Sequence, residues 1–164
     1  AETVHSQLGT TDTMVMFDLD DFKAKNTQYG HVQADLILHA LSAKMKTNIR
    51  STDIAGAWPE KDSTEPKAGR VGGEEFALFF PNTTPANLST AKDFFTEENG
   101  VLKVNFSIRL KIQETENYED VNVTVSGAVA AWEPTKKLLE VFERVDATLN
   151  KIKATGKNRI EIVQ

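Results

Sequence analysis

The stretch RVGGEEFALFF, residues 70–80, places two glycines and two adjacent glutamates between apolar segments. Residues 76–80 form an apolar run of strand length that ends at Pro81, so we predict a strand there. Residues 69–71 are its predicted hairpin partner, because glycine adopts positive φ at little cost and lets the chain reverse. The turn between these two strands would carry Gly72, Gly73, Glu74 and Glu75.

A second carboxylate-bearing segment lies near the start of the chain. Residues 14–17 (MVMF) are apolar and are predicted to form a buried strand. Asp18 and Asp20 follow, and residues two apart share one face of a strand. If the end of this strand meets the glycine turn at a sheet edge, their carboxylates form the oxygen donor set that Mg²⁺ prefers.

The remaining pattern alternates helices and strands. After Gly30, apolar residues recur at helical spacing to about residue 49, and a second such pattern runs from Thr135 to a stop at Gly156. The other predicted elements are strands at 53–57 and 159–163, a helix at 85–98, and a hairpin of 106–113 with 121–132. We therefore expect an α/β domain, with a mostly antiparallel central sheet flanked by helices.

Composition limits the classes of function. The 164 residues suffice for one domain, and the net charge of −5 argues against a nucleic-acid partner. The chain has no cysteine, which excludes disulfides and thiolate chemistry. No apolar run is long enough to cross a membrane, so the domain itself is not expected to span one. The absence of cysteine fits a reducing, cytoplasmic location, including the cytoplasmic part of a membrane-bound protein. Residues 1–13 have the character of a linker or a truncated segment before a domain at 14–164.

Separated blocks of the chain then point to a family. FDLDDFK (17–23), Asn26, YGHVQAD (29–35), RVGGEEF (70–76) and DATLNKIKATGKN (146–158) occur in order. Together they resemble the GGDEF domains, the diguanylate cyclases that join two GTP molecules into cyclic di-GMP. The resemblance covers nearly all of residues 14–163. It implies a ferredoxin-like fold like the palm of nucleotide cyclases and polymerases.

The resemblance also implies a reaction. Two GTP molecules, one on each domain of a dimer, give cyclic di-GMP and two pyrophosphates by attack of a 3′-hydroxyl on an α-phosphate. Asp18 and Glu74 match the catalytic, metal-binding carboxylates, and the Leu19 carbonyl is a further ligand of two Mg²⁺ (or Mn²⁺) ions in each half-site. Asp20 and Glu75 are interpreted as supporting groups rather than ligands.

Further positions match the substrate contacts of the family. Asn26, His31 and Asp35 match the residues that hold guanine, although helix-dipole complementarity for Asp35 and a place in the helix cap for His31 are alternatives. The phosphate set comprises Phe22, Lys23, Lys153 and Lys157. Of these, Phe22 is better interpreted as a packing residue, and Lys157 stands where arginine is usual. Asn150 replaces a usual tyrosine and has no assigned role, while Asp146 is expected to help fix the last helix.

Some features depart from the family pattern. Arg50 and Asp53 form an Arg-x-x-Asp motif like the inhibitory product site, displaced by an insertion at about 54–71, and an ordinary helix-end ion pair is the alternative. The family's Leu-Thr-Gly-Leu block is missing before residue 14. A sensory or regulatory region is expected to precede the domain and bring two copies together. Competing hypotheses are a degenerate GGDEF domain that binds GTP or cyclic di-GMP without turnover, and a polymerase-like or adenylate-type cyclase palm.

Overall fold

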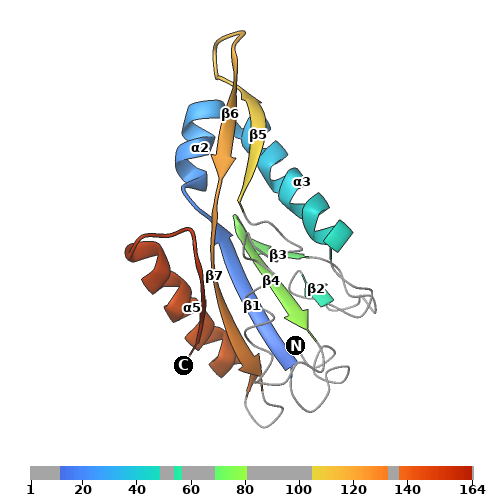
Figure 1. The fold of residues 1–164 in the computed structure, drawn as a ribbon, viewed down its shortest axis with the longest axis vertical. Helices are drawn as coiled ribbons and strands as arrows, with labels where there is room; N and C mark the ends of the chain where they lie inside the picture. The colour runs from blue at the N-terminus through green and yellow to red at the C-terminus, as the bar shows by residue number, and fades with distance from the viewer. Residues whose placement is uncertain (1–11, 49–53, 57–68, 81–104, 133–136, 164) are drawn as a thin grey trace.

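The computed structural model describes residues 12–48, 54–56, 69–80, 105–132 and 137–163. In these ranges, no helix is both long and apolar enough to cross a membrane. The elements, shown in Figure 1, are β1 (Asp12–Leu19), α2 (Phe22–Tyr29), α3 (His31–Asn48), β2 (Ile54–Gly56), β3 (Gly69–Gly72), β4 (Glu75–Phe80), β5 (Phe106–Lys111), β6 (Tyr118–Val123), β7 (Val125–Trp132), α5 (Leu138–Ala154) and β8 (Ile160–Ile162).

The main sheet has the strand order β2-β4-β1-β7-β8, and β3 also pairs with β4. All of its pairings are antiparallel except the parallel pair of β7 with β8. This confirms the predicted mostly antiparallel sheet. β1 is central and is paired on both edges, so its carboxyl end lies between β4 and β7.

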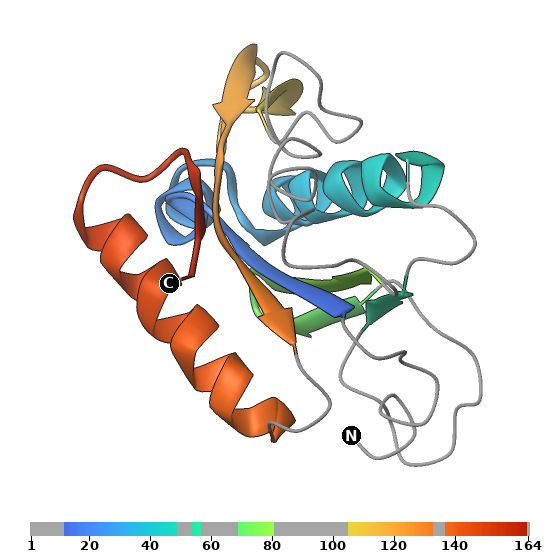
Figure 2. The same cartoon turned by 60° about the horizontal axis from the view of Figure 1, so that its bottom comes forward.

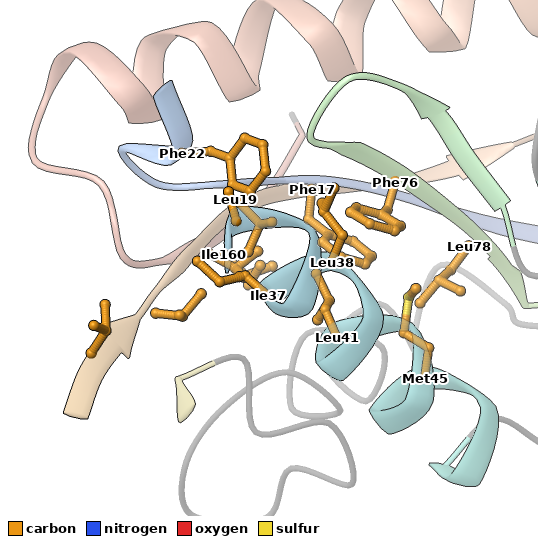
Figure 3. Packing of buried hydrophobic residues seen from close by; sticks show 14 of the residues in the cluster. Phe17, Leu19, Phe22, Ile37, Leu38, Leu41, Met45, Phe76, Leu78 and Ile160 are labelled. Atoms are coloured by element: carbon orange, nitrogen blue, oxygen red, sulfur yellow. The ribbon is translucent and has the colours of Figure 1, made fainter. Parts of the chain in front are cut away.

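Helices cover both faces of this sheet (Figure 2). Alternate residues of β1 enter different clusters, because successive side chains of a strand point to opposite faces. Val15 and Phe17 pack with α3, whereas Met14 and Met16 pack with α5. The rings of Phe17 and Phe76 stack with centroids 5.4 Å apart under α3 (Figure 3). Since both faces are covered, β1 is a continuous buried strand rather than an alternating one.

The amphipathic helices confirm the periodicity on which they were predicted. In α3 the buried side chains recur every three or four residues, as do those of α5. The α3 set is Ala34, Ile37, Leu38, Leu41 and Met45, and the α5 set is Val141, Val145, Leu149 and Ile152. Gly156 follows α5 with φ 126°, which fits the predicted stop. The predicted helix at 85–98 lies outside the described residues.

Helix α2 was not predicted. Only Phe22 and Tyr29 of its eight residues are buried, so it carries no apolar stripe. The two lie seven residues apart, or about two helical turns, and therefore share one face. A pattern search over the sequence has almost nothing to detect in such a helix.

The predicted long hairpin is wrong in part. β5 pairs with β6 alone, in a separate sheet of two strands, while β7 joins the main sheet beside β1. The change occurs at Thr124, whose carbonyl accepts a hydrogen bond from the Asp20 amide at 2.9 Å. Alternating apolar residues continue through this point, so periodicity alone does not show where the chain leaves one sheet for another. Figure 1 shows the β5–β6 hairpin extending beyond the main sheet.

Candidate functional site

The two carboxylate-bearing segments meet at the carboxyl end of β1. Asp18 lies opposite Glu75 in the β1–β4 register. The Leu19 amide donates a hydrogen bond of 3.3 Å to the Glu74 carbonyl, which holds the end of β1 against the turn. The structure therefore brings Asp18, Leu19 and Glu74 together, as the sequence predicted.

The turn itself has the expected hairpin form, with one difference between its glycines. Gly73 has φ 50° and a Cβ placed on it would meet no atom within 4 Å, so the space above it is open. Gly72, in contrast, is the last residue of β3. Glu74 is half-buried in the turn, and Glu75 begins β4.

The Asp18 carboxylate is buried with a partner on only one of its two oxygens. The residue is 2% exposed, and Lys153 Nζ contacts its Oδ2 at 2.6 Å. Its Oδ1 has no hydrogen-bond partner among the described residues. Burial raises the pKa of Asp18 to about 6; Lys153 opposes this rise, and the charges of Glu74 and Glu75 add to it. A buried carboxylate with a bare oxygen and other carboxylates nearby is a site that favours a cation.

The donor set fits a hard divalent ion in part. Asp18 Oδ1 is free to coordinate, and Leu19 and Glu74 lie at the same sheet edge, joined by a backbone hydrogen bond. Oxygen donors of this kind suit Mg²⁺, which keeps several waters and phosphate oxygens as further ligands. Within the described ranges, no three His, Cys, Asp or Glu side chains gather as a metal cluster. The site offers few protein ligands and leaves the rest of the coordination open.

Asp20 has a different environment from Asp18, although it is equally buried at 2% exposure. Its carboxylate accepts hydrogen bonds from Thr124 Oγ1 at 2.8 Å, Ser126 Oγ at 2.7 Å and the Asn158 amide at 3.0 Å. These partners come from the β6–β7 junction, from β7 and from the turn after α5. Asp20 therefore supports the site by tying three segments to the end of β1.

The segment between β1 and α2 faces the turn after α5. Asp21, the residue before α2, has φ 56° and pairs with Lys157, whose Nζ lies 2.5 Å from its Oδ1. This contact lowers the pKa of the Asp21 carboxyl. Sequence reasoning assigned no role to the Asp21 side chain; its signal is an aspartate directly after a strand, a residue type that tolerates left-handed backbone.

The other predicted phosphate residues separate into two kinds. Phe22 is 6% exposed and belongs to the core cluster, so its side chain packs, as its alternative interpretation held, and only its backbone could reach a phosphate. Lys23 is exposed in the first turn of α2. The free amides of that first turn and the helix dipole favour an anion at this end of the helix.

Two of the predicted guanine residues are in contact. Asn26 Oδ1 in α2 lies 3.0 Å from His31 Nδ1 in α3. Gly30, with φ 80°, joins the two helices, and this junction is the α2–α3 corner. His31 is the first residue of α3, which agrees with its cap-region interpretation. Asp35 is exposed one turn later on the same helix face. It lies beyond the first turn, in which α3 has no acidic residue, so dipole complementarity explains Asp35 poorly.

The remaining assignments concern Asp146 and Asn150 in α5 and the Arg50–Asp53 motif. Asn150 Nδ2 donates a hydrogen bond of 3.1 Å to Asp146 Oδ2 within α5, which is consistent with a role of Asp146 in that helix. Arg50 and Asp53 lie outside the described residues, so the product-site hypothesis stays a prediction.

Comparison with known proteins gives a consistent result. The family model for "Diguanylate cyclase, GGDEF domain" matches residues 2–159. The chain is 30% identical over 156 residues to diguanylate cyclase DgcM of Escherichia coli K12, covering 95% of this chain and 32% of DgcM. It is 29% identical over 150 residues to the uncharacterized protein YtrP of Bacillus subtilis, covering 90% of this chain and 21% of that protein. The chain thus spans well under half the length of these relatives.

Solved structures show the same fold. The GGDEF domain of DgcB from Caulobacter crescentus, in complex with c-di-GMP, aligns with TM-score 0.73 and 26% identity over 99% of this chain and 84% of that one. Diguanylate cyclase SiaD of Pseudomonas aeruginosa, in complex with its activator SiaC, aligns with TM-score 0.70 and 25% identity over 98% and 54% of the two chains. The predicted palm-like α/β fold is confirmed.

Proposed function

The chain belongs to the GGDEF family of diguanylate cyclase domains, and from this premise we propose that it condenses two GTP molecules into cyclic di-GMP and two pyrophosphates. The observation that carries the proposal is the meeting of Asp18 with the Gly73–Glu74 turn on adjacent strands. A buried carboxylate with an oxygen that accepts no hydrogen bond is costly for the fold alone, and a bound cation would offset that cost.

The residues of the site then take these roles. Asp18 and Glu74 would hold two Mg²⁺ or Mn²⁺ ions together with the Leu19 carbonyl. When bound, such ions lower the pKa of the attacking 3′-hydroxyl and neutralise charge on the attacking and leaving oxygens. The open space over Gly73 admits the nucleotide, and Asp20 keeps the end of β1 in place through its three hydrogen bonds.

Base selection is proposed for the α2–α3 corner. Guanine presents an N1–H and an exocyclic amine on one edge, and the exposed carboxylate of Asp35 can accept from both. The amide of Asn26 offers a donor and an acceptor, and its contact with His31 fixes its orientation. Adenine lacks that pair of donors, so the corner favours GTP over ATP.

Turnover requires two domains face to face, because each domain holds one GTP. A solved structure of DgcB contains a coiled coil with its GGDEF domain, and SiaD was solved with an activator. We propose that this domain likewise depends on a regulatory region or partner that pairs two copies. A cytoplasmic location, where GTP and Mg²⁺ are available, is part of the same proposal.

The direct test is product formation. The domain, dimerised through a fused parallel coiled coil, is incubated with Mg²⁺ and either GTP or ATP, and cyclic dinucleotides are separated by chromatography. We expect cyclic di-GMP from GTP and no product from ATP. Glu74→Gln should reduce the rate by at least about a hundredfold, because it removes a charged ligand of the reacting centre. Glu116→Gln, at an exposed glutamate of the β5–β6 turn, is the matched control and should keep the wild-type rate.

Two outcomes would reject the proposal. Tight GTP binding without product would identify a regulator that binds GTP or cyclic di-GMP without turnover. Equal use of ATP and GTP would remove Asn26 and Asp35 from base selection and favour an adenylate-type cyclase.

A further inference from the structure

Two lysines near the end of α5 are already paired with carboxylates: Lys153 in the last turn of the helix and Lys157 in the turn after it. Lys153 Nζ lies 2.6 Å from Asp18 Oδ2, and Lys157 Nζ lies 2.5 Å from Asp21 Oδ1. Asp18 lies in β1 next to its last residue, and Asp21 precedes α2. In the protein without ligands, the two lysines that match phosphate-binding positions therefore neutralise the protein's own acids.

The two ion pairs differ in their surroundings. The Asp18 side chain is 3% exposed and that of Lys153 is 32% exposed, whereas Lys157 and Asp21 are 39% and 56% exposed. Opposite charges attract more strongly where water is excluded. Lys153 therefore serves as the counter-ion of a buried carboxylate, while the Lys157 pair is a solvated surface contact that contributes little.

A metal ion and the Lys153 ammonium compete for Asp18. The ammonium already occupies Oδ2, and a divalent cation on the same carboxylate would lie within a few ångströms of it. Two cations that close repel each other strongly in a buried site. A metal can settle on Asp18 without this repulsion only if Lys153 moves to another anion, and a triphosphate beside the end of α5 supplies one.

Resting on the proposed function, we propose that Lys153 is an exchangeable counter-ion: it holds Asp18 until the metal–triphosphate complex arrives and then transfers to the phosphates. The site thereby selects the metal-complexed nucleotide over either the free metal or the free nucleotide. A free metal ion is repelled by the Lys153 ammonium on Asp18. A free triphosphate finds both lysines already paired, and the negative charges of Asp21 and Glu74 repel it.

Because coupling between two ligands is reciprocal, the exchange can be tested from the metal side alone. The binding of Mn²⁺ without nucleotide is measured by electron paramagnetic resonance for wild type, Lys153→Met and Lys157→Met. Loss of the competing ammonium should raise Mn²⁺ affinity about tenfold in Lys153→Met. Lys157→Met removes the same charge nearby without freeing Asp18, and it should change the affinity less than about threefold.

The second measurement is made from the nucleotide side. Binding of a fluorescent GTP analogue is followed with Mg²⁺ and again in EDTA. Lys153→Met should lower affinity about tenfold with Mg²⁺, because the transferred ammonium then contacts phosphate. In EDTA the loss should stay below about twofold, because wild-type Lys153 is still held by Asp18. Circular dichroism and thermal unfolding establish that each variant is folded.

Clear results would overturn the proposal. If the two lysine variants changed Mn²⁺ affinity equally, Lys153 would act only through its charge and not as the specific counter-ion of Asp18. An equal loss of nucleotide affinity with and without Mg²⁺ would make Lys153 a permanent phosphate ligand. Neither measurement uses turnover, so a wild-type protein that makes no cyclic di-GMP but shows the exchange would reject only the proposed reaction.

Discussion

Asp18 and Asp20 show how two identical residues, both 2% exposed, acquire opposite energetics. The carboxylate of Asp20 accepts three hydrogen bonds, whereas Asp18 has one contact with Lys153 and a bare Oδ1. Burial without full hydrogen bonding is costly for a charged group. One aspartate stabilises the fold, and the other is held at a cost that a bound cation would relieve.

For Asp18 we expect Asp18→Asn to stabilise the metal-free protein at neutral pH. The pKa of Asp18 is raised from 3.8 to about 6, so the unfolded state loses its proton first and stability falls as pH rises through this window. Above it, the variant should be more stable by up to about 3 kcal/mol. Urea unfolding in EDTA at pH values above and below the window measures this, and the gain should shrink below pH about 4. A variant less stable than wild type at neutral pH would show that the Lys153 pair outweighs burial.

Asp20→Asn should have the opposite effect. The substitution turns one acceptor oxygen into a donor facing groups that donate, and we expect a loss of about 1–3 kcal/mol in the free energy of unfolding. The same urea experiment measures it, with Asp120→Asn at an exposed position of β6 as the control. A loss no larger than that of the control would mean that Asp20 does not anchor the junction.

At the scale of elements, the α2–α3 corner is attached to the β5–β6 hairpin. Tyr29 Oη donates to Glu119 Oε1 at 2.6 Å, and Gln28 Nε2 donates to the same oxygen at 3.2 Å. Gln33 Oε1 accepts from the Lys111 amide at 2.9 Å. The hairpin, which stands outside the main sheet, is thus bound to the two helices that carry the predicted guanine contacts.

The Tyr29 contact predicts an alkaline transition. Burial, followed by the hydrogen bond and the charge of Glu119, raises the pKa of Tyr29 from 10.0 to about 12. Because the neutral phenol is favoured in the fold, stability should fall as pH rises through this range. Near-ultraviolet titration of the two tyrosines should show a late step that Tyr29→Phe removes. A late step that survives in the variant would assign it to Tyr118 instead.

At the scale of the whole molecule, the three-layer arrangement gathers the candidate site on one edge. β1 is central, so its end is flanked by the β3–β4 turn on one side and by β7 and the turn after α5 on the other. A packed scaffold on both faces holds this edge in position. In the proposed reaction this edge would contribute one half-site and a second copy of the domain the other.

If two half-sites must meet, the specific activity of the isolated domain should depend on its concentration. At concentrations where monomers dominate, we expect the rate per molecule to rise roughly in proportion to total protein, by mass action. Fusion to a parallel coiled coil should abolish this dependence. Measurement of initial rates over a dilution series decides the matter, and a constant specific activity in the unfused domain would contradict the need for two copies.

Much of the fold followed from local pattern. The spacing of apolar residues and the residue types predict the central strand, the glycine turn and the buried faces of α3 and α5. Both signals come from residues that are close together in the sequence. Helix α2 was missed because only Phe22 and Tyr29 are buried in it. The pattern predicts a single strand over 121–132, because the chain changes sheets at Thr124 without interrupting the alternation.

The sequence by itself therefore determined the family, the mostly antiparallel α/β sheet and the residues Asp18 and Glu74 at its edge, since motif spacing and apolar periodicity are local properties. Only the tertiary structure decided that Lys153 holds Asp18, that Lys157 holds Asp21 and that Asp20 is fully hydrogen-bonded. The physical reason is that burial and the choice of partner depend on which distant segments pack together. The sequence determines which side chains are charged, whereas the fold determines which oppositely charged group each of them contacts.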